Sequence, residues 1–574
     1  MTEQHRSSNS AATSGAQDTP WWADAVVYQL YVRSFADSNG DGIGDLGGIR
    51  SRLGYLEQLG VDALWLNPCY PSPQHDHGYD VSDYFNIEPD YGDLAEFDRL
   101  VAEAGARGIK VLMDVVPNHC SSEHPWFVEA VAAGRGSAAR ERFWFREGKG
   151  EGGSEPPNNW QSIFGGSSWS RINEPDGSPG QWYLHIFDSR QPDLNWNHPE
   201  VAEMFDSMLR FWFDRGVAGF RADAIAVLGK ADGLPDYDRS HDKGEIGNEN
   251  PHHTFHPSGH VAWRRWRKMV EDYAAEHPDN QPFLVCEAYT PDVATFRAFV
   301  NPEQFHQGFV FDLMMRPWTA AEVTASIAET VGDLLPAGLA PAWTLNNHDA
   351  QRAVTRRGRA DAHLVSTGNN LLNSTAPVDI ALGIRRARAL TLVQLALPGS
   401  VYLYCGEELG LPEVLDIPAE ARQDPVFLRT EGRELGRDGC RVPLPWNADP
   451  TGSFGFSPAG AAAPWMPQPA DWGTYAADAQ GVEGSTLEFY RAAIAERRRH
   501  HAFRGADFQW RSSGSTDVLA FSRGDALVVL NTSATAVALP AELVGDRRVA
   551  AASQPDQTSA TTLAGDTAMW LVAR

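Results

Sequence analysis

The sequence predicts an α/β protein built around a (β/α)8 barrel. Short apolar runs recur along the chain with helical stretches between them, which is the alternation that such a barrel requires. Three carboxylates, Asp223, Glu287 and Asp349, each come at the end of a different run. Because the carboxyl ends of barrel strands converge on one face, these positions predict one shared site.

Eight runs are predicted as the barrel strands. They span residues 26–31, 63–67, 111–116, 217–221, 283–286, 309–311, 343–345 and 401–404. Apolar residues at helical spacing predict helices at 94–107, 201–214, 380–396 and 487–500. Each short run alone is ambiguous between strand and helix, so the alternation over the whole chain carries the prediction.

Two regions break this alternation and predict further domains. Residues 120–193 are irregular, and a structureless loop of that length is uncommon, so a small inserted domain is expected after the third strand. Residues 501–574 hold short alternating runs, at 518–521, 526–530, 537–539 and 569–572, with Gly and Asn turns, which predict a C-terminal all-β sandwich. The barrel then comprises 20–119 and 194–500. Residues 1–19 lack an apolar segment and are expected to be a disordered tail.

Composition limits the class of partner. The 574 residues include 48 Lys and Arg against 75 Asp and Glu, a formal net charge of −27. Nucleic acids and anionic membranes bind basic patches, so neither is expected as a partner. No apolar run is long enough to span a bilayer.

The cysteines predict a reducing compartment. They are Cys69, Cys120, Cys286, Cys405 and Cys440, an odd number without a CxxC pair. Four of them lie in or beside apolar runs, so reduced core thiols are expected. Together with the absence of a leader segment, this predicts a cytoplasmic protein.

Two of the carboxylates suggest a chemistry. Arg221 and Asp223 lie two residues apart on a strand and therefore face the same side. The guanidinium is expected to lower the pKa of Asp223, as a nucleophile requires, although a structural ion pair is more common for an isolated R-x-D. Glu287 follows four apolar residues, which would raise its pKa and keep it protonated as a general acid; a helix cap is the alternative. Such a pair is typical of glycoside hydrolysis.

Two further strand ends hold polar groups. His119 ends the run 114–119, where an imidazole could contact a sugar hydroxyl, and His348 and Asp349 end the run 346–349. Each could instead be a turn rich in Asn and Asp. Four such independent alternatives, two turns, an ion pair and a helix cap, would rarely fall in this order, after strands three, four, five and seven.

The segment 37–45 predicts a metal loop. Oxygen-bearing groups recur at every second position, with Gly42 where a sharp turn is needed. Its expected ligands for Ca²⁺, or for Mg²⁺, are Asp37, Asn39, Asp41, the carbonyl of Ile43, and Asp45. An EF-hand would have Glu at the twelfth position, where Gly48 stands, so the loop lies outside that class. A metal-free turn is the alternative.

In order, the segments 114–119, 219–224, Glu287 and 346–349 resemble the four main regions of glycoside hydrolase family 13, the α-amylase family. The resemblance covers nearly the whole chain from Trp21 onward. Residues 191–195, Gln-Pro-Asp-Leu-Asn, resemble a fifth region found in its oligo-1,6-glucosidase and α-glucosidase branch. Members of that branch act from the non-reducing end of short substrates.

The resemblance implies a role for each matched residue. Asp223 would be the nucleophile, Glu287 the acid/base, and Asp349 would hold the 2- and 3-hydroxyls of the sugar. Other matched positions would bind substrate: Asp76, Tyr79, His119, Phe164, Phe187, Gln191, Arg221, His348 and Arg437. Among them, Asp76 and Arg437 would grip the terminal 4-hydroxyl and make the enzyme exo-acting, although Arg441 lies close to Arg437 in sequence. The segment 37–45 matches a structural Ca²⁺ site.

The expected activity is therefore that of a retaining α-glucosidase that also transfers glucose, with its two carboxyls about 5–5.5 Å apart. In this branch the residue after the nucleophile tends to be Val in α-1,6 enzymes and Ala or Thr in α-1,4 enzymes, so Ala224 favours α-1,4 substrates such as maltose. Alternatives are a trehalose- or sucrose-converting transferase or isomerase, an α-1,6-oligoglucosidase, an inactive binding protein, and a metal-dependent hydrolase. The polar insertion 229–260 could shape the aglycone subsites.

Overall fold

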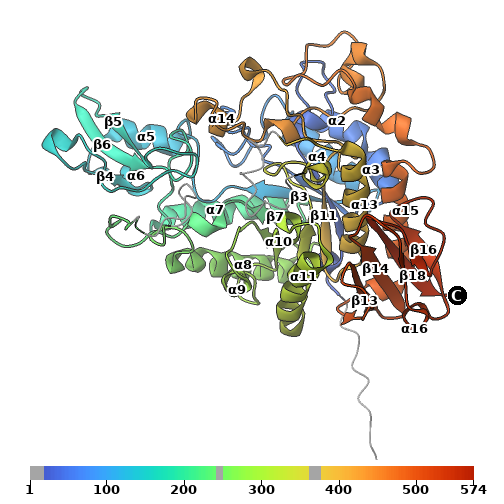
Figure 1. Ribbon diagram of the computed structural model, residues 1–574. Coiled ribbons are helices and arrows are strands. Elements are labelled where there is room, and N and C mark those ends of the chain that lie inside the picture. The colour runs from blue at the N-terminus through green and yellow to red at the C-terminus, as the bar shows by residue number, and fades with distance from the viewer. Residues whose placement is uncertain (1–18, 239, 241–249, 361–375) are drawn as a thin grey trace, which may run out of the picture.

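The computed structural model describes residues 19–238, 240, 250–360 and 376–574. Its centre is a closed barrel of eight parallel strands in the order β1-β11-β10-β9-β8-β7-β3-β2 (Figure 1). The strands are β1 (Val26–Leu30), β2 (Ala63–Leu66), β3 (Lys110–Val115), β7 (Gly219–Ala222), β8 (Phe283–Cys286), β9 (Gln307–Val310), β10 (Ala342–Thr344) and β11 (Ser400–Tyr404). The predicted barrel is confirmed, strand for strand. The expected tail 1–19 lies outside the described residues except for residue 19.

Helices cover the outside of the barrel. The main ones are α3 (Leu53–Leu59), α4 (Leu94–Gly105), α7 (Pro199–Phe213), α8 (His260–Glu276), α9 (Val293–Phe299), α11 (Ala320–Leu334), α13 (Ile380–Ala396) and α15 (Thr486–Arg499). Asp93, Asp379 and Ser485 cap α4, α13 and α15: each side chain accepts a hydrogen bond from the backbone N–H three residues later in the chain. The four predicted helices lie within two residues of these bounds. Shorter helices are α1 (Val32–Phe35), α2 (Leu46–Ser51), α10 (Asp312–Met315) and α12 (Ala353–Gly358).

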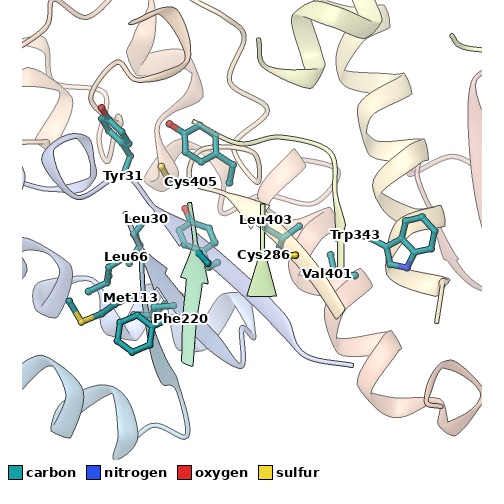
Figure 2. Close-up of a cluster of buried hydrophobic side chains, with 14 of the residues drawn as sticks. Leu30, Tyr31, Leu66, Met113, Phe220, Cys286, Trp343, Val401, Leu403 and Cys405 are labelled. Atoms are coloured by element: carbon teal, nitrogen blue, oxygen red, sulfur yellow. The ribbon is translucent and has the colours of Figure 1, made fainter. Parts of the chain in front are cut away.

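Alternation along the strands divides the apolar core into two clusters. Val27, Trp65, Leu112 and Tyr402 belong to one cluster, which fills the barrel. Their strand neighbours belong to a larger second cluster that packs under the helices; Figure 2 shows Leu30, Leu66, Met113, Phe220, Val401 and Leu403 from five strands of the barrel. Successive side chains of a strand point to opposite faces, so one set of short strands supplies both layers.

A small antiparallel sheet follows β3 in the chain. It consists of β4 (Phe145–Arg146), β6 (Pro179–Leu184) and β5 (Trp169–Asn173), with α5 (Pro125–Ala133) and α6 (Ala138–Glu141) beside it. In Figure 1 this inserted part stands off one side of the barrel. The described part of the insertion after β7 packs on it: Asn158 Nδ2 donates to the Leu234 carbonyl at 3.0 Å, and Trp160 Nε1 to the Pro235 carbonyl at 2.8 Å. Residues 239 and 241–249 of that insertion lie outside the described residues.

The C-terminal part is mostly β, with two short helical turns, His501–Phe503 and α16 (Ala541–Val544). Its five-stranded sheet has the order β12 (Gln509–Trp510), β13 (Val518–Arg523), β14 (Ala526–Asn531), β18 (Thr567–Ala573) and β16 (Arg547–Ala552); β15 (Val537–Ala538) and β17 (Thr562–Leu563) form a second sheet. The five-stranded sheet docks on α13, where Trp570 Nε1 of β18 donates to the Leu392 carbonyl at 2.9 Å. β16 was not predicted, because its Arg-Arg-Val-Ala-Ala-Ala sequence lacks bulky alternating side chains.

All five cysteines are buried free thiols, as expected. Among the described residues, no helix combines the length and the apolar character needed to cross a membrane.

Candidate active site

Arg221 lies at the centre of the predicted site. In the barrel register it pairs with Asp114 of β3, so both side chains point to the barrel interior. Arg221 Nη1 donates to Asp114 Oδ1 and to Asp223 Oδ1, both at 2.8 Å, and Nη2 lies 2.7 Å from Glu287 Oε2. Arg221 is 1% exposed. One buried guanidinium therefore joins the predicted nucleophile and the predicted acid/base.

Burial raises the pKa of the carboxyls around Arg221. The pKa of Asp114 rises to about 7, and the pKa values of Asp223 and Glu287 are raised as well, although the positive charge of Arg221 lowers all three. The rise at Glu287 was predicted. Arg221 lowers the pKa of Asp223 as expected, but desolvation outweighs it, so the net pKa of Asp223 is raised and not lowered. A single positive charge faces three carboxyls in a site removed from water, so desolvation and carboxylate repulsion exceed its effect. The three carboxyls thus share one positive charge, and burial makes the ionised form costly for at least one of them.

Asp349 has the opposite electrostatic setting. Its Oδ1 accepts from Arg437 Nη1 at 3.0 Å and from Arg441 Nη2 at 2.8 Å. Burial works against the charge, but His348 and the two arginines together hold the pKa of Asp349 below its usual range. Asp349 is therefore the carboxyl of the site that ionises most readily.

Arg437 also joins Asp349 to Asp76. Arg437 Nη2 donates to Asp76 Oδ1 at 2.9 Å, and Gln191 Nε2 donates to Asp76 Oδ2 at 3.0 Å. The guanidinium is oriented from behind by Asp424, whose Oδ2 accepts from Arg437 Nε at 2.6 Å. Arg437 thus reaches Asp76 and Arg441 does not, although both contact Asp349. Burial raises the pKa of Asp76 to about 6.

His348 is held in one orientation by buried neighbours. Gln29 Nε2 donates to His348 Nδ1 at 2.8 Å, so the neutral ring has its proton on Nε2. That nitrogen lies 2.6 Å from the Tyr79 hydroxyl and 3.3 Å from Asp349 Oδ2. The Tyr79 and His348 rings stack 5.2 Å apart and nearly parallel. Burial lowers the pKa of His348 well below its usual value, which keeps the ring neutral.

Aromatic side chains from the inserted part form another wall. His119 packs on Phe187 with ring centroids 5.0 Å apart, and Phe187 meets Phe164 edge-on at 5.5 Å. The Arg437 guanidinium lies 5.4 Å from the centre of the Phe164 ring. His119 Nε2 lies 3.2 Å from the Tyr79 carbonyl, and burial lowers the pKa of His119 to about 4. The predicted residues of the site therefore come together through a connected set of contacts.

Three further features were missed by sequence reasoning. Lys230 forms a fully buried ion pair with Asp193 at 2.9 Å, which ties the segment after β7 to the inserted part.

Tyr289 is 51% exposed two residues after Glu287, and its ring stacks on Phe311 at 4.2 Å. Arg429, in α14 (Pro425–Arg429), donates to Asp188 and to the Gly165 carbonyl of the inserted part, beside which α14 lies in Figure 1. An isolated Lys or Arg in a polar segment gives no sequence signal for such contacts.

The loop 37–45 is closed by its own hydrogen bonds. Asp37 accepts from the backbone N–H groups of Asn39, Gly40 and Gly42. Asp45 caps α2 through Gly48 N at 2.6 Å and accepts from Ser38 Oγ at 2.7 Å. Gly42 has φ +90°, the left-handed turn for which glycine was expected there.

Within the described ranges, no group of three or more His, Cys, Asp or Glu side chains is arranged to hold a metal ion. The oxygens of Asp45 accept hydrogen bonds from Ser38 and from the N-terminus of α2. Calcium binding remains a prediction, and no step of the chemistry is assigned to a metal.

Comparison with known proteins identifies the family. The family model for the α-amylase catalytic domain matches residues 29–506. The chain belongs to the α-amylase family. It is a glycoside hydrolase, and its substrates are small carbohydrates. As an α-amylase family member it is similar to the oligo-1,6-glucosidase of Parageobacillus thermoglucosidasius, with 34% identity over 84% of each chain.

Two further relatives of this family member bear other names. A probable α-glucosidase of Rhizobium meliloti (strain 1021) is 34% identical, over 86% of this chain and 85% of that one. The crystal structure of an α-glucosyl transfer enzyme superposes with a TM-score of 0.79 at 34% identity, covering 97% of this chain and all of that chain. Two glucosidases and a glucosyl transfer enzyme thus have the same sequence identity to this chain, 34%.

Proposed function

We propose that this α-amylase family member is a retaining, exo-acting α-glucosidase that removes terminal non-reducing α-1,4-linked glucose from maltose and short oligosaccharides. The observation that supports this most is the contact of Asp223 and Glu287 with the two ends of one guanidinium, that of Arg221. Two carboxyls that share one partner are close enough for one to attack while the other transfers a proton.

In the first step, an Asp223 oxygen forms a bond to the anomeric carbon of the terminal glucose. The bond from that carbon to the glycosidic oxygen breaks, and the proton of Glu287 passes to the departing oxygen. In the second step, Glu287 takes a proton from water, whose oxygen replaces Asp223 at the anomeric carbon. The product keeps the α configuration, because the configuration is inverted twice.

The other residues support this assignment by their charge. Asp349 is ionised and can accept hydrogen bonds from two sugar hydroxyls as positive charge develops on the ring. The Asp76–Arg437 pair would close the far end of the glucose subsite and bind its 4-hydroxyl, which gives exo action. Phe164, Phe187 and Tyr79 offer apolar faces for the sugar ring.

The experiment is to incubate the protein separately with maltose, isomaltose, trehalose and sucrose, and to follow products by anomer-resolved NMR. Early α-glucose from maltose with little from isomaltose is the expected result. Early β-glucose would refute retention, and faster release from isomaltose would refute the α-1,4 preference. The matched control is Asp223→Asn, which keeps the shape of the nucleophile and should release no glucose.

Glucosyl transfer is the second candidate, because a similar solved structure is that of an α-glucosyl transfer enzyme. Tyr289 supports it: its exposed ring, stacked on Phe311 two residues beyond Glu287, could receive the ring of an acceptor. The same assay separates the two activities. New disaccharides or trisaccharides with little free glucose would favour a transferase over a hydrolase.

A further inference from the structure

Ala224, which directly follows the predicted nucleophile, has an unusual backbone conformation. Its φ of 47° and ψ of 35° lie in the left-handed region, which residues with a Cβ rarely adopt. This conformation turns the chain sharply at the end of β7, between Asp223 and the short helical turn Ile225–Val227. As a result the N–H of Ala224 faces the neighbouring strand end, where it donates to Glu287 Oε2 at 3.3 Å.

We infer that Ala224 is a positioning residue that orients the acid/base Glu287 through its backbone N–H. Arg221 Nη2 also contacts Glu287 Oε2, at 2.7 Å. Two donors thus occupy the same oxygen, which must act as an acceptor. The acidic proton of Glu287 then resides on Oε1, and the carboxyl group has one productive orientation toward the leaving oxygen. This inference rests on the proposed function.

The side chain of Ala224 is confined as well. Its methyl group packs against an apolar cluster that includes Trp160 and Trp169 of the inserted part. A larger side chain at position 224 would therefore affect the site in two ways: through its volume, and through how well the residue adopts the left-handed conformation. The two effects can be separated, because Asn tolerates that conformation and Thr, which is similar in size and also polar, does not.

The test compares Ala224→Thr with Ala224→Asn and Ala224→Gly. Each variant is assayed with maltose, whose leaving group needs protonation, and with 4-nitrophenyl α-glucoside, whose leaving group needs little. We expect Ala224→Thr to lower kcat/KM on maltose about tenfold more than on the aryl glucoside, a loss set by the cost of the left-handed backbone. Asn and Gly should keep the wild-type ratio within about twofold. Melting temperatures exclude unfolding as the cause.

Equal changes of the ratio in the Thr and Asn variants would overturn the inference and assign the effect to volume. Crystal structures of both variants give a readout that does not depend on activity. The Thr variant should lose the contact between the residue-224 N–H and Glu287 Oε2, and the Asn variant should keep it. Retention of the contact in both would equally overturn the inference. Lack of turnover by the wild type would instead refute the proposed function, while the crystal structures still decide the role of Ala224.

Discussion

Lys230 Nζ lies 2.9 Å from Asp193 Oδ2, and neither side chain is exposed to solvent. Lys230 also donates to Asn118 Oδ1 at 3.2 Å, next to His119 of the site. The pair therefore joins three segments, the end of β3, the inserted part and the turn after β7, at the wall of the site.

Replacing Lys230 by Met should strongly destabilise the protein. The change leaves Asp193 charged and buried, which typically costs about 3–5 kcal/mol. A fall in melting temperature measured by calorimetry checks this. Lys149→Met is the matched control, because Lys149 pairs with Asp236 at 2.8 Å but both are more than half exposed. Equal effects of the two variants would contradict the role given to burial, and adding Asp193→Asn to Lys230→Met should recover part of the loss.

Glu287→Gln should abolish most activity on maltose. Loss of a positioned general acid typically costs about 10²–10⁴ in rate. On an aryl glucoside with a good leaving group the loss should be much smaller, because bond breaking there needs no proton. Steady-state kinetics on both substrates give the comparison. Equal losses on the two would show that Glu287 is not the acid.

Substrate affinity should weaken at acid pH through Asp76. Burial raises the pKa of this carboxyl to about 6, so it gains a proton as the pH falls below that value. The neutral acid loses its ion pair with Arg437, and KM for maltose should rise below about pH 6. In Asp76→Asn the KM should be high at every pH and lack this step. A wild-type KM that stays constant between pH 7 and 5 would contradict the assignment.

Calcium, if it binds, should act on stability. Addition of Ca²⁺ to protein treated with a chelator should raise the melting temperature, because a ligand that binds only the folded state stabilises it. Asp41→Ala should remove the shift, since Asp41 is an exposed member of the loop whose loss leaves the contacts of Asp37 and Asp45 in place. No shift in the wild type would mean that the hydrogen bonds of the loop suffice.

Tyr289→Ala should reduce transfer to aromatic acceptors more than hydrolysis. An aromatic stack contributes about 0.5–1.5 kcal/mol, which corresponds to a loss of roughly two- to tenfold in the transfer-to-hydrolysis ratio. Product analysis with maltose as donor and a phenol as acceptor measures this ratio. Tyr289→Phe keeps the stack and should leave it unchanged; a fall in that variant would assign the effect to the hydroxyl instead.

Most of the barrel was predictable because its signals are local. Strands of three to six mostly apolar residues that end in a polar cluster identify both the element and its carboxyl end, and in a parallel barrel all those ends face one side. Asp223, Glu287 and Asp349 could therefore be placed in one site from the sequence. Regions with weak patterns were missed, such as β16, whose small and charged residues hide its alternation.

The pKa of Asp223 could not be predicted, because it depends on what surrounds the group in the folded chain. The sequence places Arg221 beside Asp223, and from that pair alone a lowered pKa follows. Only the folded chain brings Asp114 and Glu287 to the same guanidinium and removes water, which reverses the direction. The same holds for Lys230 and Asp193, whose pairing joins segments that have no common sequence pattern.

The sequence by itself determined the family, the barrel, and which side chains stand at the ends of its strands, because each of these follows from short-range pattern. The tertiary structure decided which groups share a partner and how the backbone turns between them. Arg437 rather than Arg441 reaches Asp76, and Ala224 takes a left-handed conformation that directs its N–H to Glu287. These outcomes depend on distances of a few ångströms between segments far apart in the chain, which only packing can set.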